Sequence, residues 1–199
     1  TIPAAIEMLE DAKKKGYETT VNIMAISTAK ESEITEALSL LSQCPVDVIY
    51  IVDSYGSMYM EQVDDLADKY LKMAEDHGKS VGMHAHNNQQ LAFANTIAAL
   101  TRGVSYLDST IGGMGRGAGN CSSEQLLGFL KNPKYDLIPI LQFLEKHIIP
   151  LKKSGVVWGY NIPYLLTGQT NQHPRSAIAA TKEKRTDFLD FLLELNDKD

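Results

Sequence analysis

Short runs of apolar and β-branched residues alternate with longer stretches of helical periodicity four times before Pro133, and this alternation most constrains the fold. The predicted strands are residues 20–26, 47–53, 80–84 and 105–108. The predicted helices of this region are residues 4–15, 31–41, 60–77, 89–102 and 123–130. Such alternation is typical of βα units that build a parallel sheet. We therefore expect an α/β protein.

Beyond Pro133 the alternation stops, and only helices are expected, at residues 136–154, 176–184 and 186–195. The prediction is thus a βα region over residues 1–132 and a helical region over residues 133–199. Four βα units cannot close an eight-stranded barrel, which takes about 250 residues. Either an open doubly wound sheet or the second half of a barrel fits. Because a helix precedes the first strand, we expect an upstream segment to be missing.

Charge and composition exclude several classes of partner. Lys and Arg number 19 against 25 Asp and Glu, which gives a net charge of −6. That balance argues against a nucleic acid or an anionic membrane surface as the main partner. No apolar run approaches the roughly 20 residues of a membrane span, and no secretory signal is visible. Cys44 and Cys121 lie in no ligand-like spacing and are expected to be free thiols in the cytoplasm.

Two histidines, His84 and His86, end the third predicted strand. Because side chains at i and i+2 of a strand point to the same face, these imidazoles can converge. Gly82 lies on that face and leaves room there, and active sites of parallel sheets collect at the carboxyl ends of the strands. The pattern favours a divalent-metal site over a pair of hydrogen-bonded core histidines, but two ligands do not identify the metal.

The second predicted strand ends in Asp53 and Ser54. Both residue types also form turns or cap helices at such places, so a structural role for Asp53 stays open. The Ser54 hydroxyl can donate to or accept from a polar substrate. Both residues are candidate substrate contacts, and Ser54 is the better one.

A glycine-rich loop, residues 111–120, follows the fourth predicted strand. It matches neither the dinucleotide-binding nor the Walker pattern. Its glycines indicate a close backbone approach or positive φ, and a phosphate-cradling loop and a flexible turn both remain open. Asn120 at its end could cap the next helix, or its amide oxygen could complete a site for a hard cation.

Three motifs occur in an order known from one superfamily. They are Asp53-Ser54-x-Gly56, His84-x-His86-Asn87, and Asp108-Ser109 followed by Gly113-Met114-Gly115-Arg116-Gly117-Ala118-Gly119-Asn120. Together they resemble the metal-dependent pyruvate aldolase and acyl-CoA lyase superfamily, the HMGL-like TIM barrels, over roughly residues 1–130. The loop looks most like that of the 4-hydroxy-2-oxovalerate aldolase branch. The lyase branch carries a catalytic cysteine in this loop, and here none occurs before Cys121.

The resemblance implies a TIM (β/α)8 barrel of which this chain supplies strands five to eight, followed by a helical tail. By position, His84 and His86 match two metal-binding histidines, and Asn120 matches an asparagine that ligates the metal in some branches. Ser54 matches a serine that contacts substrate. The family's remaining ligand, an aspartate, follows an arginine on the first strand, with a catalytic histidine shortly after. No Arg-Asp pair occurs in this chain, so the missing N-terminal half of the barrel is an expected partner.

A second conspicuous segment, residues 158–168, resembles the region after the barrel in aldolase-like proteins, where a tyrosine works as acid or base. Tyr160 is the first match and Tyr164 the second, with a packing role as the alternative for both. His173, before Pro174, is expected to be structural. The last helix carries Phe188, Leu189, Leu192 and Leu195 at helical spacing, which fits core packing or the subunit contact of a homodimer.

The implied activity is that of a metal-dependent carbon–carbon lyase. It would cleave a 4-hydroxy-2-oxoacid to pyruvate and an aldehyde through a metal-stabilised enolate. Mn²⁺ or Mg²⁺ suits the implied ligands, and Zn²⁺ stays open. Two alternatives remain: a Claisen-type lyase or synthase acting on an acyl-CoA, and a non-catalytic half-barrel that serves as a binding module if the chain is complete.

Overall fold

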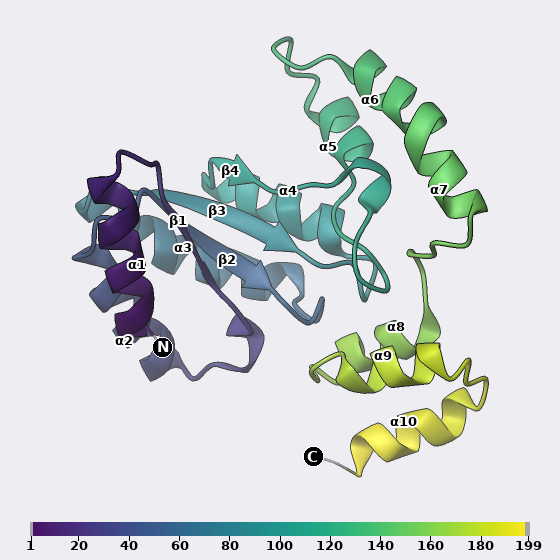
Figure 1. Ribbon diagram of the computed structural model, residues 1–199. Helices are drawn as coiled ribbons and strands as arrows, with labels where there is room; N and C mark the ends of the chain where they lie inside the picture. Colours follow the sequence, from purple (N-terminus) through teal and green to yellow (C-terminus); the bar gives the residue numbers. More distant parts are fainter. Residues whose placement is uncertain (1, 198–199) are drawn as a thin grey trace. The chain divides into compact units, whose positions relative to one another are not determined.

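A computed structural model describes residues 2–197 and contains a small parallel sheet accompanied by helices (Figure 1). Its α-helices are α1 (Ile2–Lys14), α2 (Glu31–Ser42), α3 (Met60–Asp76), α4 (Ala92–Arg102), α5 (Ser123–Leu130), α6 (Leu137–Phe143), α7 (Ile149–Lys153), α8 (Ile162–Gln169), α9 (Arg175–Lys182) and α10 (Phe188–Asn196). Its strands are β1 (Thr20–Ile23), β2 (Val48–Asp53), β3 (Ser80–Ala85) and β4 (Tyr106–Leu107). Short 3-10 turns cover Ile26–Thr28 and Ile111–Gly113, and a π-helical turn covers Leu144–Ile148.

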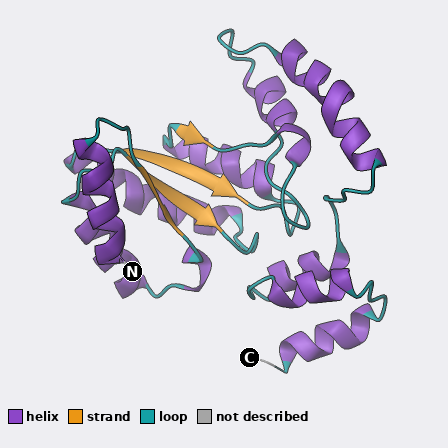
Figure 2. Cartoon of the chain, viewed as in Figure 1, coloured by secondary structure: helices purple, strands orange, loops and turns teal. Residues whose placement is uncertain are grey.

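The sheet has the order β1-β2-β3-β4, so each strand lies beside its neighbour in sequence (Figure 2). β1 and β2 run parallel with Thr20 opposite Val48, and β3 and β4 run parallel with Gly82 opposite Tyr106. A parallel neighbour requires a crossover connection, and here helices α2, α3 and α4 supply it. The predicted α/β class with a parallel sheet is confirmed.

The central and edge strands differ strongly in burial. Every residue of β2 is buried, whereas β1 alternates between exposed and half-buried residues. The nearly continuous apolar run of β2 is what a strand covered on both faces requires. β1 lies at one edge of the four-stranded sheet.

The chain forms two compact units. The first comprises the described residues up to Ser54 together with Tyr59–His84 and Asn95–Asp108. The second comprises Tyr55–Met58, Ala85–Ala94 and the described residues from Ser109 onward. The division into residues 1–132 and 133–199 stays a prediction.

The first unit has its core between the strands and helices α2 and α3. Ile49 and Ile51 of β2 are 0% exposed, as is Val63 of α3. α3 packs on β2 and on α2. Apolar residues spaced three and four apart along α3 give it one buried face, which explains why this stretch forms a helix against the sheet.

The second unit packs the glycine-rich loop against the C-terminal helices. One cluster joins Ala118 of the loop to Tyr164 of α8 and Ala177 of α9. Another joins Ala180 of α9 to Phe191 and Leu195 of α10. Core packing is therefore confirmed for Leu195, whereas it is wrong for Leu189, for which the subunit contact stays a prediction. Leu189 is 70% exposed, and Phe191 takes the buried position instead.

Two predicted elements begin or end at the wrong residue because of left-handed backbone. The strand predicted to reach residue 26 ends at Ile23, since Ala25 has φ +54° and Ile26 starts a 3-10 turn. The helix predicted from residue 89 starts at Ala92, since Gln90 has φ +62°. The Asn87 side chain accepts a hydrogen bond from the Ala92 N–H at 3.1 Å and so closes the turn before the helix.

The C-terminal helices also differ from the prediction. The helix predicted at residues 136–154 is helical from Leu137 to Lys153, but a π-helical turn at Leu144–Ile148 separates α6 from α7. Helix α8 was missed. Asn161 caps it by accepting the Tyr164 N–H at 3.3 Å, and Pro163 lies in its first turn. An Asn followed by a Pro two positions later is a helix-start signal that the sequence did contain.

Among residues 2–197, none of the helices is both long and apolar enough to cross a membrane. Cys44 and Cys121 are buried free thiols, as predicted.

Candidate functional site

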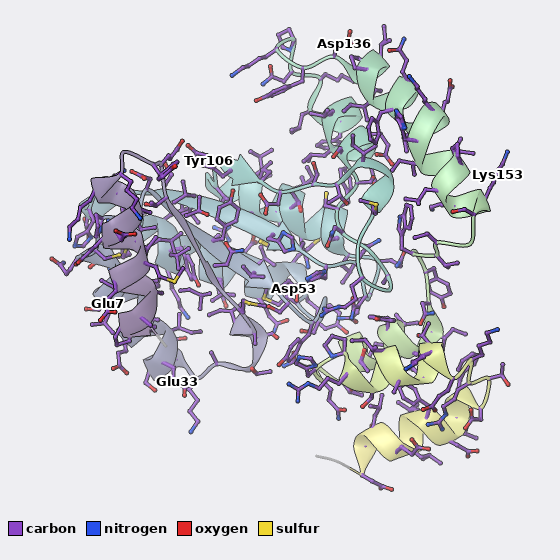
Figure 3. The ribbon with its side chains drawn as sticks, in the orientation of Figure 1. Glu7, Glu33, Asp53, Tyr106, Asp136 and Lys153 are labelled. Carbon is purple, nitrogen blue, oxygen red and sulfur yellow. The ribbon has the colours of Figure 1, made fainter. Side chains whose placement is uncertain are left out.

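The carboxyl end of β2 holds Asp53 and Ser54 in a buried turn. Asp53 is 1% exposed and Ser54 is 6% exposed, and Figure 3 labels Asp53 at this end of the strand. The Ser54 hydroxyl oxygen accepts a hydrogen bond from the Ala25 N–H at 2.7 Å. Ser54 therefore fixes the turn that follows β1, in addition to the substrate contact expected of it.

His84, on β3, is held by a neighbouring carboxylate. Its Nδ1 lies 3.0 Å from Oδ2 of Asp108, the residue that follows β4. The backbone N–H of Asp108 donates to the Met83 carbonyl at 3.0 Å, which extends the pairing of β3 and β4 by one residue. The His84 side chain is 25% exposed and that of Asp108 is 42% exposed. Solvent can therefore reach this pair.

Tyr50 of β2 completes this group from the adjacent strand. It is 8% exposed. Burial, and then the charge of Asp108 and a hydrogen bond to it, raise the pKa of Tyr50 to about 12. The ring lies over Gly82 of β3, where an added Cβ would come within 2.5 Å of it. The sequence indicated that Gly82 leaves room on this face of the sheet. In the structure, the Tyr50 ring fills that room.

The glycine-rich loop fixes Asn120 through backbone groups. The Asn120 Nδ2 donates to the Met114 carbonyl at 3.0 Å, which orients the carboxamide. Gly119 has φ +86°, and a Cβ there would come within 2.2 Å of the Gly113 carbonyl oxygen. Gly115 packs directly on the Asn120 side chain. The loop folds back so closely on itself that a side chain at these positions would collide with its backbone. This explains why glycines are so closely spaced here.

His86 and Asn120 are brought together in the second unit. They form an antiparallel bridge. On either side of it, the Asn87 N–H donates to the Gly119 carbonyl at 2.9 Å and the Cys121 N–H donates to the Ala85 carbonyl at 3.4 Å. The end of the glycine-rich loop is therefore paired along the residues that follow His84. This backbone pairing places His86 and Asn120 opposite one another.

Asn120 also provides an observation that points to a ligand. Its Oδ1 is buried and has no hydrogen-bond partner within the described residues. An unsatisfied buried amide oxygen costs free energy, so such an atom calls for an explanation. The His86 imidazole and the Asn120 amide oxygen are donor types that suit a divalent cation such as Mn²⁺ or Mg²⁺. These residues fit the group that the resemblance implies.

The donor set is incomplete within this chain. Among residues 2–197, no group of three or more His, Cys, Asp or Glu side chains is arranged to hold a metal ion. The aspartate ligand that the resemblance places on a first strand has no counterpart in this sequence. A cation held by His86 and Asn120 would need further ligands from protein or water.

Asn120 lines a cavity of about 420 Å³ in the second unit. The cavity is of the size range that small-molecule sites occupy. Its wall is mixed in character, with Trp158 and Phe93 as aromatic members and Lys152 and Glu124 as charged ones. The Trp158 Nε1 donates to the Gly112 carbonyl at 2.9 Å, and the Lys152 ammonium lies 4.6 Å from the centroid of the Trp158 ring.

The two candidate tyrosines have different environments. Tyr160 is 65% exposed, whereas Tyr164 is 4% exposed. The Tyr164 ring lies against Gly117, where an added Cβ would come within 2.1 Å, and burial raises its pKa. Tyr160 is therefore the more exposed of the two. His173 lies edge-on to Tyr55, with ring centroids 5.4 Å apart, and burial lowers its pKa.

Sequence reasoning missed the roles of Tyr50 and Asp108. Asp108 was noted only as part of a motif, and Tyr50 was one apolar residue in a buried strand. A signal did exist: Tyr50 lies within β2 and Asp108 directly follows β4, and these two strands flank β3, on which Gly82 is the smallest residue. The sequence does not give the register of the strands, so it could not show that these residues lie side by side.

Comparisons with known proteins show which family the chain is similar to. The HMGL-like family pattern matches residues 1–143, which is more than half of the 199-residue chain. The chain is 40% identical over 159 residues to a 4-hydroxy-2-oxovalerate aldolase of Pelotomaculum thermopropionicum, covering 75% of this chain and 46% of that protein. To the Thermus thermophilus protein of the same name it is 38% identical over 195 residues, covering 92% of this chain and 54% of that protein.

A solved structure shares the fold. The N-terminal domain of an aldolase-type protein from Bacteroides vulgatus superposes with a TM-score of 0.74 at 30% identity, covering 90% of this chain and 60% of that one. This chain spans about half the length of the two curated relatives, 46% and 54%. From its motifs, its parallel sheet and these matches, the chain belongs to the HMGL-like family.

Proposed function

We propose that this chain is part of a divalent-metal-dependent aldolase that cleaves a 4-hydroxy-2-oxoacid to pyruvate and an aldehyde. The observation that carries the proposal is the buried Asn120 Oδ1, which has no hydrogen-bond partner among the described residues and belongs to a residue paired with His86. The names of the relatives from Pelotomaculum and Thermus support the same reaction.

We further propose that β1 to β4 correspond to strands five to eight of a (β/α)8 barrel. Two observations support this assignment: the sheet is parallel with sequential strand order, and its edge strand β1 is only half-buried. In a closed barrel no strand lies at an edge. The remaining strands, with the first-strand aspartate ligand, the arginine and the catalytic histidine, would come from outside these residues.

In this proposal His84, His86 and Asn120 hold the cation. When bound, it supplies Lewis-acid stabilisation of the negative charge that develops as the carbon–carbon bond breaks. The chain's own groups provide the surroundings. Asp53 and Ser54 end the neighbouring strand and contact the oxoacid, and Tyr160, which is exposed, donates or accepts a proton at its phenolic oxygen.

A chimera tests the activity directly. This chain would replace the matched segment of the Thermus thermophilus relative, to which it aligns over 195 residues. Pyruvate release from 4-hydroxy-2-oxovalerate would be measured with Mn²⁺ present. We expect release above background, with strong loss in the His86→Ala form. A folded chimera that releases no pyruvate, while the parent relative does, would refute the proposal.

Metal binding by the chain itself gives a second measurement. Replacing Asn120 by Ala removes a proposed ligand, and we expect the affinity for Mn²⁺ to fall by at least about 100-fold, since even groups that only support ligands cost 10- to 100-fold. Asn132→Ala is the matched control, because Asn132 is exposed and caps only the Lys134 N–H. Unchanged affinity in Asn120→Ala would remove Asn120 from the site.

A further inference from the structure

Three polar side chains form a connected row across neighbouring strands of the first unit. Tyr50 comes from β2, His84 from β3, and Asp108 from the residue after β4. Asp108 is the middle member, because its Oδ2 lies 3.0 Å from the His84 Nδ1, and its charge and a hydrogen bond to it help to raise the pKa of Tyr50. Neither Tyr50 nor Asp108 has a part in the function proposed above.

The contact between His84 and Asp108 determines which ring nitrogen carries the proton. A carboxylate only accepts hydrogen bonds, so the Nδ1 that lies 3.0 Å from the Asp108 Oδ2 must be the donor. In the neutral ring the Nε2 then carries the lone pair. An imidazole nitrogen can bind a cation only through such a lone pair.

The contact between Tyr50 and Asp108 restrains the carboxylate in turn. Tyr50 is buried, and its ring is confined over Gly82, where even a methyl group would not fit. Its phenol stays protonated through the neutral range, because burial and Asp108 raise its pKa to about 12. A protonated phenol donates, so one carboxylate receives a hydrogen bond from the tyrosine and one from the histidine.

We propose that Asp108, restrained by Tyr50, is a positioning residue that fixes the His84 ring with the proton on Nδ1 and the lone pair on Nε2, which is the form in which Nε2 would ligate a divalent cation. The cation in this statement rests on the proposed function, whereas the tautomer of His84 does not. A carboxylate behind a ligating histidine orients the ring and raises its basicity, and removing it costs about 10- to 100-fold in metal affinity.

Nitrogen-15 NMR of the metal-free chain tests the tautomer. The spectrum would be recorded near pH 9, where imidazoles are neutral, and the signals of the five histidines assigned. We expect His84 in the Nδ1–H form. His77 serves as an internal reference, because its Nδ1 lies 2.8 Å from the Met73 carbonyl, which can only accept. An Nε2–H form of His84 in the unmodified chain would overturn the proposal without any variant.

The variant Asp108→Asn tests the cause. It keeps the shape of the side chain but removes the charge, and we expect His84 to shift toward the Nε2–H form while His77 stays unchanged. Asp64→Asn is the matched control, since Asp64 pairs with Arg102 and not with a histidine. If the His84 tautomer is the same in Asp108→Asn as in the unmodified chain, Asp108 does not position the ring.

Mn²⁺ titration of the same proteins separates this inference from the proposed function. We expect about 10- to 100-fold weaker binding in Asp108→Asn, and a smaller loss in Tyr50→Phe, which keeps the carboxylate. Loss of binding in Asp108→Asn without a change of tautomer would make Asp108 a ligand itself and overturn the positioning role. If the unmodified chain shows the Nδ1–H form but binds no Mn²⁺, the positioning role is supported and the metal site of the proposed function is not.

Discussion

His84 and Asn120 are both proposed ligands of one cation, but the protein holds them by different means. Side chains hold His84: Asp108 contacts its ring and Tyr50 contacts Asp108. Backbone groups hold Asn120: the Met114 carbonyl accepts its amide, and the loop folds back through glycines. The first arrangement can be altered one functional group at a time, whereas the second depends on the path of the chain itself.

This difference has a consequence for substitution. A crowded position next to a side chain can be relieved by shortening that side chain, but a crowded position next to a backbone carbonyl cannot. The glycines of the two regions, Gly82 beside Tyr50 and Gly119 beside Gly113, provide the comparison.

The largest effect is expected for Gly119→Ala. The new Cβ would come within 2.2 Å of the Gly113 carbonyl oxygen, and φ is +86°. The combined strain should lower the free energy of unfolding by about 3 kcal/mol, measured by urea denaturation. Gly16→Ala is the control, because Gly16 has φ +84° with no atom within 4 Å. It should cost only about 1 kcal/mol. Equal losses in the two variants would show that backbone crowding in the loop is unimportant.

A smaller effect is expected for Gly82→Ala. The Cβ would meet the Tyr50 ring at 2.5 Å, and overpacking of this kind costs about 2 kcal/mol. In a Tyr50→Val background the same substitution should cost less than about 1 kcal/mol, because the two positions are coupled. A double-mutant cycle in urea measures this relief. If Gly82→Ala costs the same free energy of unfolding in both backgrounds, the crowding at Gly82 does not come from the Tyr50 side chain.

The smallest effect is expected from Tyr50, one of the side chains that support His84. Its titration should lower the free energy of unfolding at alkaline pH. The pKa of Tyr50 is about 12 in the folded chain, against an ordinary value of 10.0. Between these values the folded state keeps a proton that the unfolded state has released, so stability is complete below about pH 10 and falls as the pH rises. The loss should be about 1 kcal/mol at pH 11.

Urea denaturation at pH 9 and pH 11 measures this loss. Tyr50→Phe should reduce the difference between the two pH values, while Tyr17→Phe, which changes a 64% exposed tyrosine, should not. Residues 111–120 contain no tyrosine, so the glycine-rich loop has no phenol of its own that titrates in alkali. If the difference in stability between pH 9 and pH 11 is unchanged in Tyr50→Phe, it comes from another group. Tyr70 is such a group, because burial also raises its pKa.

The sequence predicted the elements far better than their ends. The run Val48 to Val52 could only be a buried strand, and the spacing along α3 could only be a helix with one apolar face. The end of β1 could not be read, because Ala25 adopts a left-handed backbone that alanine seldom takes and that its sequence does not signal.

The candidate ligands were predicted because motif spacing reports residues that are near in the chain or fixed by a family pattern. His86 and Asn120 were both named in this way, and the structure pairs them. The support behind His84 was not predicted. Tyr50 lies in β2, His84 in β3, and Asp108 directly after β4. These residues meet only because of the register of the strands, which depends on packing across the whole sheet rather than on local sequence.

β1 exposes one side of its backbone at the edge of the sheet. Unpaired N–H and C=O groups along such an edge form a template on which any extended segment can add a strand. For the chain on its own, the edge of the four-stranded sheet within residues 2–197 favours self-association, and handling at low protein concentration is the practical consequence.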